Sequence, residues 1–363
     1  MLGDSLVPGR RWPTRRLGKR RGGDYNPATP TPSARAPLNL LFVTSTRIGD
    51  AVLSTGLLDH LITRHPGLRV TVACGVAAAP LFAALPGLER VVPMDKRPVL
   101  GHWIRLWLAT VGQRWDLVVD LRGSALAWLL RAGTRQVWRK QTGGAHRVVQ
   151  LAALLGLDAP PAPRIWLAPA HHAAACRMIP DGAPVLALGP TTSWPGKQWP
   201  LDRFAALALR LTARDGPLPD ARIAVFAAPD ERAAAAPLLE RLPRARTIDT
   251  IDAGDLLTVA AALQRCTLYI GNDSGLMHLA AASGVPTLGL FGPSDDRHYA
   301  PWGAGNVVVR TPLSFVELVA QRRADPARVA ELMDTLDVEA AWRAALSLLQ
   351  RAGAPRVARQ ESA

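Results

Sequence analysis

The sequence predicts an α/β fold in which two Rossmann-like domains face a cleft, and three observations support this prediction. The chain has 363 residues, which suits two domains of about 150 residues better than one. It is 48% hydrophobic but only 6% aromatic, a composition more typical of an α/β protein than of an all-β or disordered one. Short apolar runs also alternate with helical patterns, as they do in parallel sheets built from βαβ units.

The first α/β half is expected at residues 38–169. Apolar runs predict strands at residues 38–45, 69–74, 90–94 and 116–121, and a helical pattern follows each of them. Four prolines between residues 157 and 169 interrupt these patterns, so this stretch is predicted to connect two domains.

The second half is expected at residues 170–336, with helical patterns between most of its strands. An amphipathic pattern at residues 338–352 predicts a last helix, so residues 337–363 are expected to cross between the domains and to end in a frayed tail. Ligands bind at the carboxyl ends of such sheets, which here would face each other across the cleft. The predicted strands of this half are residues 185–188, 222–227, 267–271, 287–291 and 306–310.

The formal net charge of +14 is distributed unevenly. Residues 1–37 carry eight basic and two acidic side chains and lack hydrophobic periodicity, so we expect a disordered basic arm there. This arm is either an uninformative extension or a tether to an anionic membrane or nucleic acid. The remaining +8 belongs to the folded body, and a basic body attracts nucleic acids, acidic phospholipids or phosphorylated glycolipids.

The cysteines and the hydropathy pattern limit the protein class. Cys74, Cys176 and Cys266 are odd in number and far apart, which argues against a disulfide framework or a zinc site and fits a reducing cytosol. No apolar segment of signal-peptide character follows the basic N-terminus, and no run of about 18 apolar residues occurs. The protein is expected to be soluble or attached to a membrane only peripherally.

The most informative segment is residues 269–292, whose order of apolar run, polar turn, small-residue helix and second apolar run predicts a βαβ unit. Asp273, Ser274 and Gly275 would lie where unpaired backbone N–H groups and the helix dipole favour an anion such as phosphate. A simple helix cap is the alternative. A cap needs one polar side chain, whereas Asn272 and His278 add two more, and this surplus favours a phosphate site.

A second candidate is the loop at residues 46–50, between the first predicted strand and its helix. Gly49 permits a tight turn, so Asp50 would be carried at the start of the helix and face the cleft. A carboxylate at that point either caps the helix or accepts a proton from a hydroxyl nucleophile.

A third candidate is the loop at residues 189–200, which also follows a predicted strand. The hydroxyls of Thr191 and Thr192 and the ammonium of Lys197 are suited to phosphate oxygens. Six residues separate Gly189 from Gly196, and the residue after Lys197 is not Ser or Thr, so an ATPase P-loop is rejected. An ordinary surface loop with a Pro-Gly turn is the alternative.

Further polar residues lie at other predicted strand ends. Glu231 could accept both hydroxyls of a ribose, although helix capping by Asp230 is the simpler interpretation of that loop. Asp120 and Arg122 are candidates for substrate contacts, whereas His146 is interpreted more readily as a helix cap than as a catalyst. Because no G-x-G-x-x-G follows a predicted strand and no basic recognition helix is found, dinucleotide and specific DNA binding are weakly supported.

Three motifs together resemble glycosyltransferase family 9, the lipopolysaccharide core heptosyltransferases. Their order and spacing match the family over about residues 38–350. The resemblance implies the glycosyltransferase B architecture of two Rossmann-like domains, in agreement with the two halves described above. The motifs are Arg47-Ile-Gly-Asp50, Thr191-Thr192 with Lys197-Gln-Trp-Pro200, and Asn272-Asp-Ser-Gly-Leu-Met-His-Leu-Ala280, of which the last is the most specific.

This resemblance implies an inverting transfer of heptose from ADP-L-glycero-D-manno-heptose to the lipid A–Kdo inner core at the cytoplasmic face of the inner membrane. Asp50 matches the general base that would deprotonate the acceptor hydroxyl. Arg47, Asp120 and Arg122 would contact the acceptor. On the donor side the resemblance implies roles for Thr191, Thr192 and Lys197 at the diphosphate, Glu231 at the ribose, Asp273 at sugar hydroxyls, and Ser274, Gly275, Leu276 and His278 at the diphosphate end.

The resemblance also implies the partners. These are an ADP-sugar, an anionic lipopolysaccharide acceptor and a peripheral inner-membrane contact, with no specific nucleic acid, no metal or cofactor, and a monomeric state. Residues 193–196 lack the charged residues that some heptosyltransferases carry, and the basic arm is outside the family pattern. Another nucleotide-sugar, another core position, a catalytically silent nucleotide- or glycan-binding homologue, and a nucleic-acid-binding protein remain alternatives.

Overall fold

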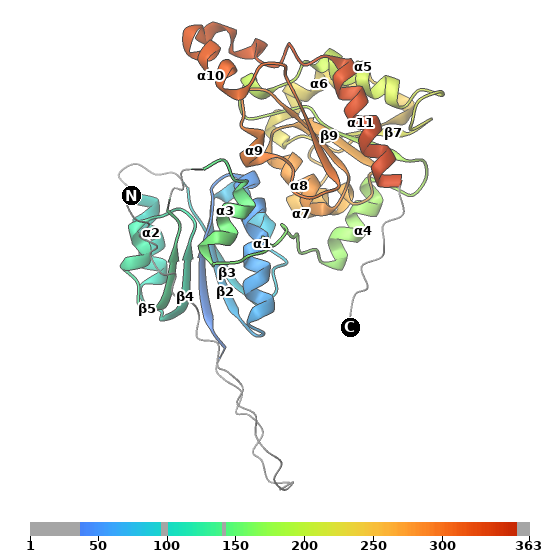
Figure 1. The fold of residues 1–363 in the computed structure, drawn as a ribbon. Helices are drawn as coiled ribbons and strands as arrows, with labels where there is room; N and C mark the ends of the chain where they lie inside the picture. Colours follow the sequence, from blue (N-terminus) through green and yellow to red (C-terminus); the bar gives the residue numbers. More distant parts are fainter. Residues whose placement is uncertain (1–36, 96–100, 140–142, 354–363) are drawn as a thin grey trace, which may run out of the picture.

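Two parallel sheets with helices on their faces form the body of the protein (Figure 1). The structure is a computed structural model that describes residues 37–95, 101–139 and 143–353. The two sheets confirm the predicted α/β class. The basic arm up to residue 36 and the frayed tail predicted at the C-terminus lie outside the described residues.

The first sheet has the strand order β3-β2-β1-β4-β5, and all its pairs are parallel. Its helical elements are α1 (Ile48–Arg64), η1 (Val76–Phe82), α2 (Gly101–Thr110), η3 (Ala125–Trp128) and α3 (Arg147–Leu154). Its strands are β1 (Asn39–Val43), β2 (Arg69–Cys74), β3 (Leu88–Pro93), β4 (Trp115–Asp120) and β5 (Ala132–Val137).

The second sheet has the order β11-β10-β9-β6-β7-β8, again entirely parallel. Its strands are β6 (Val185–Gly189), β7 (Arg222–Val225), β8 (Thr247–Asp249), β9 (Leu268–Asn272), β10 (Thr287–Phe291) and β11 (Asn306–Arg310). Its helical elements are α4 (Pro169–Met178), η4 (Pro195–Lys197), α5 (Leu201–Leu211), η5 (Pro229–Glu231), α6 (Arg232–Arg241), η6 (Arg244–Arg246), α7 (Leu256–Leu263), α8 (Gly275–Ser283), α9 (Asp296–Tyr299), α10 (Phe315–Ala324), η7 (Pro326–Glu331) and α11 (Val338–Gly353).

Side-chain alternation along the strands divides the core into layers. On β1, Leu40 and Phe42 face α1, whereas Leu41 and Val43 pack on the opposite face with buried residues of α2 and η3. The layer that contains α1 also contains α4, α7, α8 and one face of the second sheet. One continuous apolar core therefore joins the two domains, and α2 and η3 form the outer layer of the first domain.

The connector and the last helix pack differently from each other. The connector lies against α1, because a Cβ atom on Gly56 would come within 2.4 Å of the carbonyl oxygens of Pro161 and Ala162. The last helix, α11, was predicted to cross between the domains. Its buried residues Ala341 and Ala345 instead join the core of the second domain, where the helix packs on α5, β10 and β11.

No helix in the described parts of the chain is both long and apolar enough to span a bilayer. Those same parts contain no cluster of three or more His, Cys, Asp or Glu side chains placed to hold a metal ion. The three cysteines are unpaired, and burial raises the pKa of the Cys74 thiol and of the Cys266 thiol to about 12.

Candidate functional site

The N-termini of α1 and α8 meet where the two domains face each other. A Cβ atom on Gly49 would lie 2.8 Å from Cδ2 of His278 and 3.4 Å from Cα of Gly275, and one on Gly275 would lie 3.0 Å from Cβ of Ile48. Glycine is required at both positions because any side chain would push the helices apart. Two sets of unpaired backbone N–H groups thus converge on one point, which favours an anion there.

Asp50 projects from the first turn of α1 into a cavity of about 280 Å³. Ser45 donates a hydrogen bond from Oγ to Oδ2 of Asp50 at 3.4 Å. The cavity is a cleft between the domains, because Tyr299 of α9 lines it together with residues of the first domain. Burial, followed by the nearby Asp50 carboxylate, raises the pKa of Tyr299, so its hydroxyl stays protonated. A carboxylate in a partly enclosed cavity is placed to accept a proton from a bound hydroxyl.

Arginines surround this cavity. Arg122 lines it and places its guanidinium 5.6 Å from the ring centroid of Trp103. Arg147, in the first turn of α3, also lines it and stacks at 4.3 Å on Trp138, a further lining residue. Arg47 is exposed at the N-cap of α1. Sequence reasoning missed Arg147 and Trp138 because neither belongs to a recognisable motif.

Asp120 holds the turn that carries Arg122. Its carboxylate is completely buried and accepts hydrogen bonds from the backbone N–H groups of Arg122 at 2.8 Å and Ser124 at 2.9 Å. The Ser124 hydroxyl donates a third bond to it at 2.5 Å. These contacts make Asp120 a positioning residue for Arg122 rather than a direct contact for a ligand.

Asn272 fixes the loop between β6 and α5. Its Oδ1 accepts from the backbone N–H of Trp199 at 3.0 Å, and its Nδ2 donates to the carbonyl of Pro190 at 2.8 Å. The side chain is fully buried. Part of the polar surplus in the 269–292 segment therefore serves the loop rather than a ligand.

The loop brings Lys197 to Asp273. Lys197 Nζ lies 2.5 Å from Oδ2 of Asp273, whose other oxygen lies 3.9 Å from Nε2 of His278. Burial lowers the pKa of His278, although the carboxylates of Asp273 and Asp50 oppose this shift. The pair thus places an ammonium beside the N-terminus of α8, where a phosphate would meet both.

A second bonded pair lies next to it on the same edge of the sheet. Thr191 donates from Oγ1 to Oε2 of Glu231 at 2.6 Å, and the same oxygen accepts from the backbone N–H of Ala228 at 3.2 Å. Thr192 donates to the carbonyl of Trp194 at 2.7 Å and so helps to shape the loop. Within the described part of the chain, Oε1 of Glu231 accepts no hydrogen bond, which leaves it for a hydroxylated ligand.

Two buried hydroxyls behind these pairs were not predicted as a set. Tyr269 is completely buried on β9, and its ring crosses Gly189 and Gly271, where a Cβ would lie 1.9 and 2.3 Å from its hydroxyl. This hydroxyl lies beside Oγ of Ser274, and neither of the two binds any other described residue. Burial raises the pKa of Tyr269, so its hydroxyl remains a neutral donor at the floor of the site. Leu276 is half-buried in the first turn of α8.

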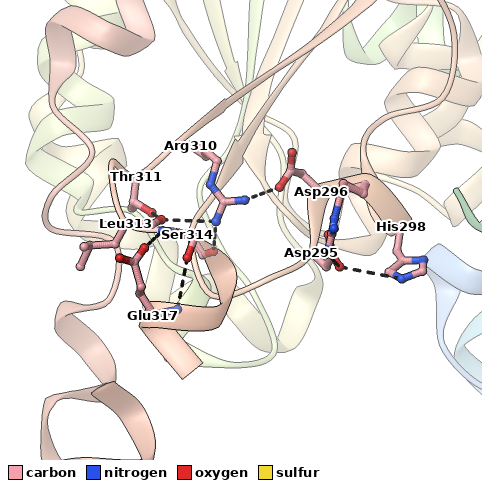
Figure 2. A network of polar contacts seen from close by, with 10 residues as sticks. Asp295, Asp296, His298, Arg310, Thr311, Leu313, Ser314 and Glu317 are labelled. Carbon is pink, nitrogen blue, oxygen red and sulfur yellow. Dashed lines mark hydrogen bonds and ion pairs between the residues drawn. The ribbon is translucent and has the colours of Figure 1, made fainter. Parts of the chain in front are cut away.

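The segment that follows β10 contacts the first domain. Figure 2 shows Arg310, at the end of β11, bridging Asp296 of α9 and the carbonyl of Leu313, and Asp295 facing His298. His298 in turn lies 2.8 Å from the carbonyl of Ala145 in the first domain.

His146 makes a parallel contact beside this one. Its Nε2 lies 2.9 Å from the carbonyl of Ala300, and its Nδ1 accepts from the backbone N–H of Val148 at 3.2 Å. This second bond confirms the predicted helix-capping role of His146.

Comparisons with known proteins agree with this geometry. The sequence model described as glycosyltransferase family 9 (heptosyltransferase) matches residues 122–327. Lipooligosaccharide heptosyltransferase 2 of Haemophilus influenzae is 22% identical over 330 residues, which cover 79% of this chain and 92% of that protein.

Solved structures share the fold. A glycosyl transferase family 9 protein from Veillonella parvula DSM 2008 has a TM-score of 0.73 at 21% identity, covering 86% of this chain and 98% of its own. The E. coli heptosyltransferase WaaC with ADP has a TM-score of 0.62 at 18% identity, covering 87% of this chain and 100% of its own. These likenesses confirm the predicted glycosyltransferase B architecture.

Proposed function

The chain belongs to glycosyltransferase family 9, and from this premise we propose that it transfers heptose from ADP-L-glycero-D-manno-heptose to the lipopolysaccharide inner core, with inversion at the anomeric carbon. One observation carries the proposal. The glycine-tipped helices α1 and α8 meet, so the carboxylate of Asp50 lies on one wall of the cleft and the Lys197–Asp273 pair lies on the other.

Asp50 is the proposed general base. An acceptor hydroxyl in the cavity would lose its proton to Asp50 and attack the anomeric carbon, while ADP leaves from the opposite face. Arg122 and Arg147 line the same cavity, and Arg47 lies at the N-terminus of α1, the helix that carries Asp50. These positive charges favour a negatively charged acceptor. We therefore propose an acceptor of the lipid A–Kdo class, with Asp120 acting through the turn that carries Arg122.

Lys197 and the N-terminus of α8 are the proposed diphosphate site. As charge grows on the leaving ADP, the ammonium and the backbone N–H groups at Gly275 and Leu276 stabilise it, with Ser274 and His278 beside them. Thr191 and Thr192 belong to the loop that delivers Lys197. Glu231 is the proposed ribose contact, and Asp273 the contact for heptose or ribose hydroxyls. This arrangement neutralises the leaving group without a metal ion.

An acceptor anchored in a membrane implies where the enzyme works. We propose that the protein acts as a monomer at the cytoplasmic face of the inner membrane, in peripheral contact with it. The excess of basic residues supports this location, because the surface of such a membrane is anionic.

Nucleotide binding is the first test. Thermal stabilisation and calorimetry of the full chain with ADP, UDP, GDP and CMP, with and without magnesium, are expected to favour ADP and to be indifferent to the metal. A preference for UDP or GDP would keep the transferase class and discard heptose. Binding of no nucleotide would favour a catalytically silent homologue.

Turnover is the second test. Incubation with ADP-heptose and lipid A–Kdo, with or without one heptose already attached, is expected to add a single heptose residue, which mass spectrometry detects. The acceptor that is used identifies the core position. Turnover with neither acceptor, despite ADP binding, would contradict the proposed acceptor class.

A further inference from the structure

The outer layer of the first domain exposes an apolar surface that the catalytic site does not use. On α2, Ile104 is 55% exposed and Leu108 is 64% exposed; at the end of η3, Trp128 is 63% exposed and Leu129 is 64% exposed. We call these four residues the outer patch. Large apolar side chains rarely gather on a monomer surface unless another phase or molecule covers them.

The four residues are neighbours rather than scattered positions. Ile104 and Leu108 are one helical turn apart, so they share the exposed face of α2. Trp107, on the adjoining side of the helix, donates a hydrogen bond from Nε1 to the carbonyl of Leu129 at 3.4 Å. This bond joins the exposed face of α2 to the segment that ends η3.

The segment that presents Trp128 is held rigidly. Arg135 of β5 donates from Nε to the carbonyl of Ala127 at 2.7 Å, and from Nη2 to the carbonyl of Leu130 at 2.7 Å. Its guanidinium also lies 5.9 Å from the ring centroid of Trp128. A rigid apolar surface loses little conformational entropy when it is covered.

Within residues 101–139, which carry the outer patch, the exposed charge has one sign. Every exposed charged side chain between residues 101 and 139 is an arginine: Arg105, Arg114, Arg122, Arg131 and Arg139. The two acidic side chains of this stretch are engaged inside the domain. Asp120 is fully buried, and Asp116 accepts a hydrogen bond from the backbone N–H of Asn39 at 2.8 Å.

Arg122 connects the cavity to α2, the helix that carries Ile104 and Leu108. Arg122 lines the cavity that contains Asp50, and its guanidinium stacks on Trp103 in the first turns of α2.

We propose that the outer patch docks on a bilayer of anionic phospholipid, with Ile104, Leu108, Trp128 and Leu129 at the level of the headgroups. Apolar and Trp side chains at the interface, combined with arginines facing anionic lipid, are the two attractions that hold a peripheral protein there. The inference rests on the proposed function for its purpose, which is to present a lipid-anchored acceptor to Asp50.

A second copy of the chain is the competing occupant. In a twofold dimer the outer patch would meet itself, so its arginines would face the arginines of the other copy without an exposed acid from residues 101–139 to pair with them. An anionic bilayer fits both the apolar and the charged parts of this surface.

Vesicle sedimentation of the full chain tests the proposal. The double variant Ile104→Glu, Leu108→Glu is expected to lose about tenfold or more in partition onto phosphatidylethanolamine vesicles that contain phosphatidylglycerol. Val316→Glu on α10 is the matched control, because Val316 is 67% exposed and lies on the second domain. Equal loss in the control, or no loss in the double variant, would overturn the proposal.

The charged component has its own test. Arg105→Gln with Arg131→Gln is expected to weaken partition onto the anionic vesicles several-fold, whereas Arg177→Gln on the second domain leaves it unchanged. Neutralising the arm within the full chain separates the two basic regions. The proposal would be overturned if neutralising the arm abolished vesicle binding while the outer-patch variants still bound the vesicles. The arm positions to replace with Gln are Arg15, Arg16, Lys19, Arg20 and Arg21.

Two further readouts separate this inference from the proposed function. Heptose transfer to a fully deacylated, soluble acceptor is expected to stay within about twofold of wild type in the Ile104→Glu, Leu108→Glu variant, because neither residue lines the cavity. If no acceptor is turned over but the variant still loses vesicle binding, the function is wrong and the docking surface stands. A dimer in light scattering that this variant dissociates would replace the bilayer with a second copy.

Discussion

The two walls of the cleft are built differently. On the proposed donor wall, in the second domain, polar side chains bind one another: Lys197 binds Asp273, and Thr191 binds Glu231. On the proposed acceptor wall, in the first domain, Asp50 lines the cavity together with Arg122 and Arg147, which stack on Trp103 and Trp138. The donor wall is thus preorganised for one shape of ligand, whereas the acceptor wall supplies a positive field and the proposed base.

Removing the base should produce the largest effect, on turnover alone. Asp50→Asn keeps the size of the side chain but cannot accept the proton, so kcat is expected to fall about 10²- to 10⁴-fold. ADP affinity, a property of the donor wall, is expected to stay the same in calorimetry. Ser45→Ala is the milder control, because it removes a long hydrogen bond to Asp50 and the acceptor of the Arg47 backbone N–H but keeps the carboxylate. Unchanged turnover in Asp50→Asn would remove Asp50 from the role of base.

Separating the walls should produce the next largest effect. Gly49→Ala places a Cβ atom 2.8 Å from the buried ring of His278, so α1 and α8 must move apart. Displacement of Asp50 from the donor is expected to lower kcat/KM about 30- to 100-fold. Gly112→Ala is the control, since nothing lies within 4 Å of a Cβ atom there. Equal activity of the two variants would show that the walls tolerate separation.

The donor wall alone is tested by Lys197→Ala. Losing a charge-assisted hydrogen bond to phosphate is expected to weaken ADP binding about 10- to 30-fold in calorimetry. Lys197→Arg keeps the charge and is expected to retain most of the affinity. Binding of ADP with equal affinity to wild type and Lys197→Ala would mean that the diphosphate lies elsewhere.

The sequence predicted most of the sheet framework because buried parallel strands are apolar throughout. The strand predicted at residues 69–74 coincides with β2, and the other eight predicted strands lie within a few residues of β1, β3, β4, β6, β7, β9, β10 and β11. Strands β5 and β8 were missed. Both are edge strands with partly exposed side chains, so neither forms an apolar run.

The residues of the two walls also differ in how far the sequence could predict them. Lys197 and Asp273 were both identified, because each lies in a local motif at a strand end, although their contact across 76 residues was not foreseeable. Arg147, Trp138 and Tyr299 reach the cavity from three separate segments without a motif. Trp138 follows the missed strand β5, so its place near Asp120 could not be derived. The donor wall therefore leaves local signatures, whereas on the acceptor wall only Asp50, in the motif at residues 47–50, and Arg122, at a strand end, could be identified.

The acceptor wall is tested by Arg147→Ala. Loss of one cation from a wall that holds several is expected to raise the acceptor KM about three- to tenfold, with ADP affinity unchanged. Arg177→Ala, an exposed arginine on α4, is the control. An effect of Arg147→Ala on ADP binding instead would contradict the division of the cleft into two walls.

Lowering the pH should produce the smallest of these effects, a change in melting temperature that arises on the donor wall alone. Burial lowers the pKa of His278, so near its ordinary value of about 6.5 the unfolded chain binds a proton that the folded donor wall excludes. The free energy of unfolding that the neutral His278 contributes is therefore fully present above that pH and is lost as the pH falls toward the lowered pKa. The melting temperature of His278→Gln is expected to decline less than that of wild type between about pH 7 and pH 5. Arg147→Ala should follow the wild-type curve, because a guanidinium stays charged throughout. Parallel curves for His278→Gln and wild type would mean that the donor wall admits the proton without cost.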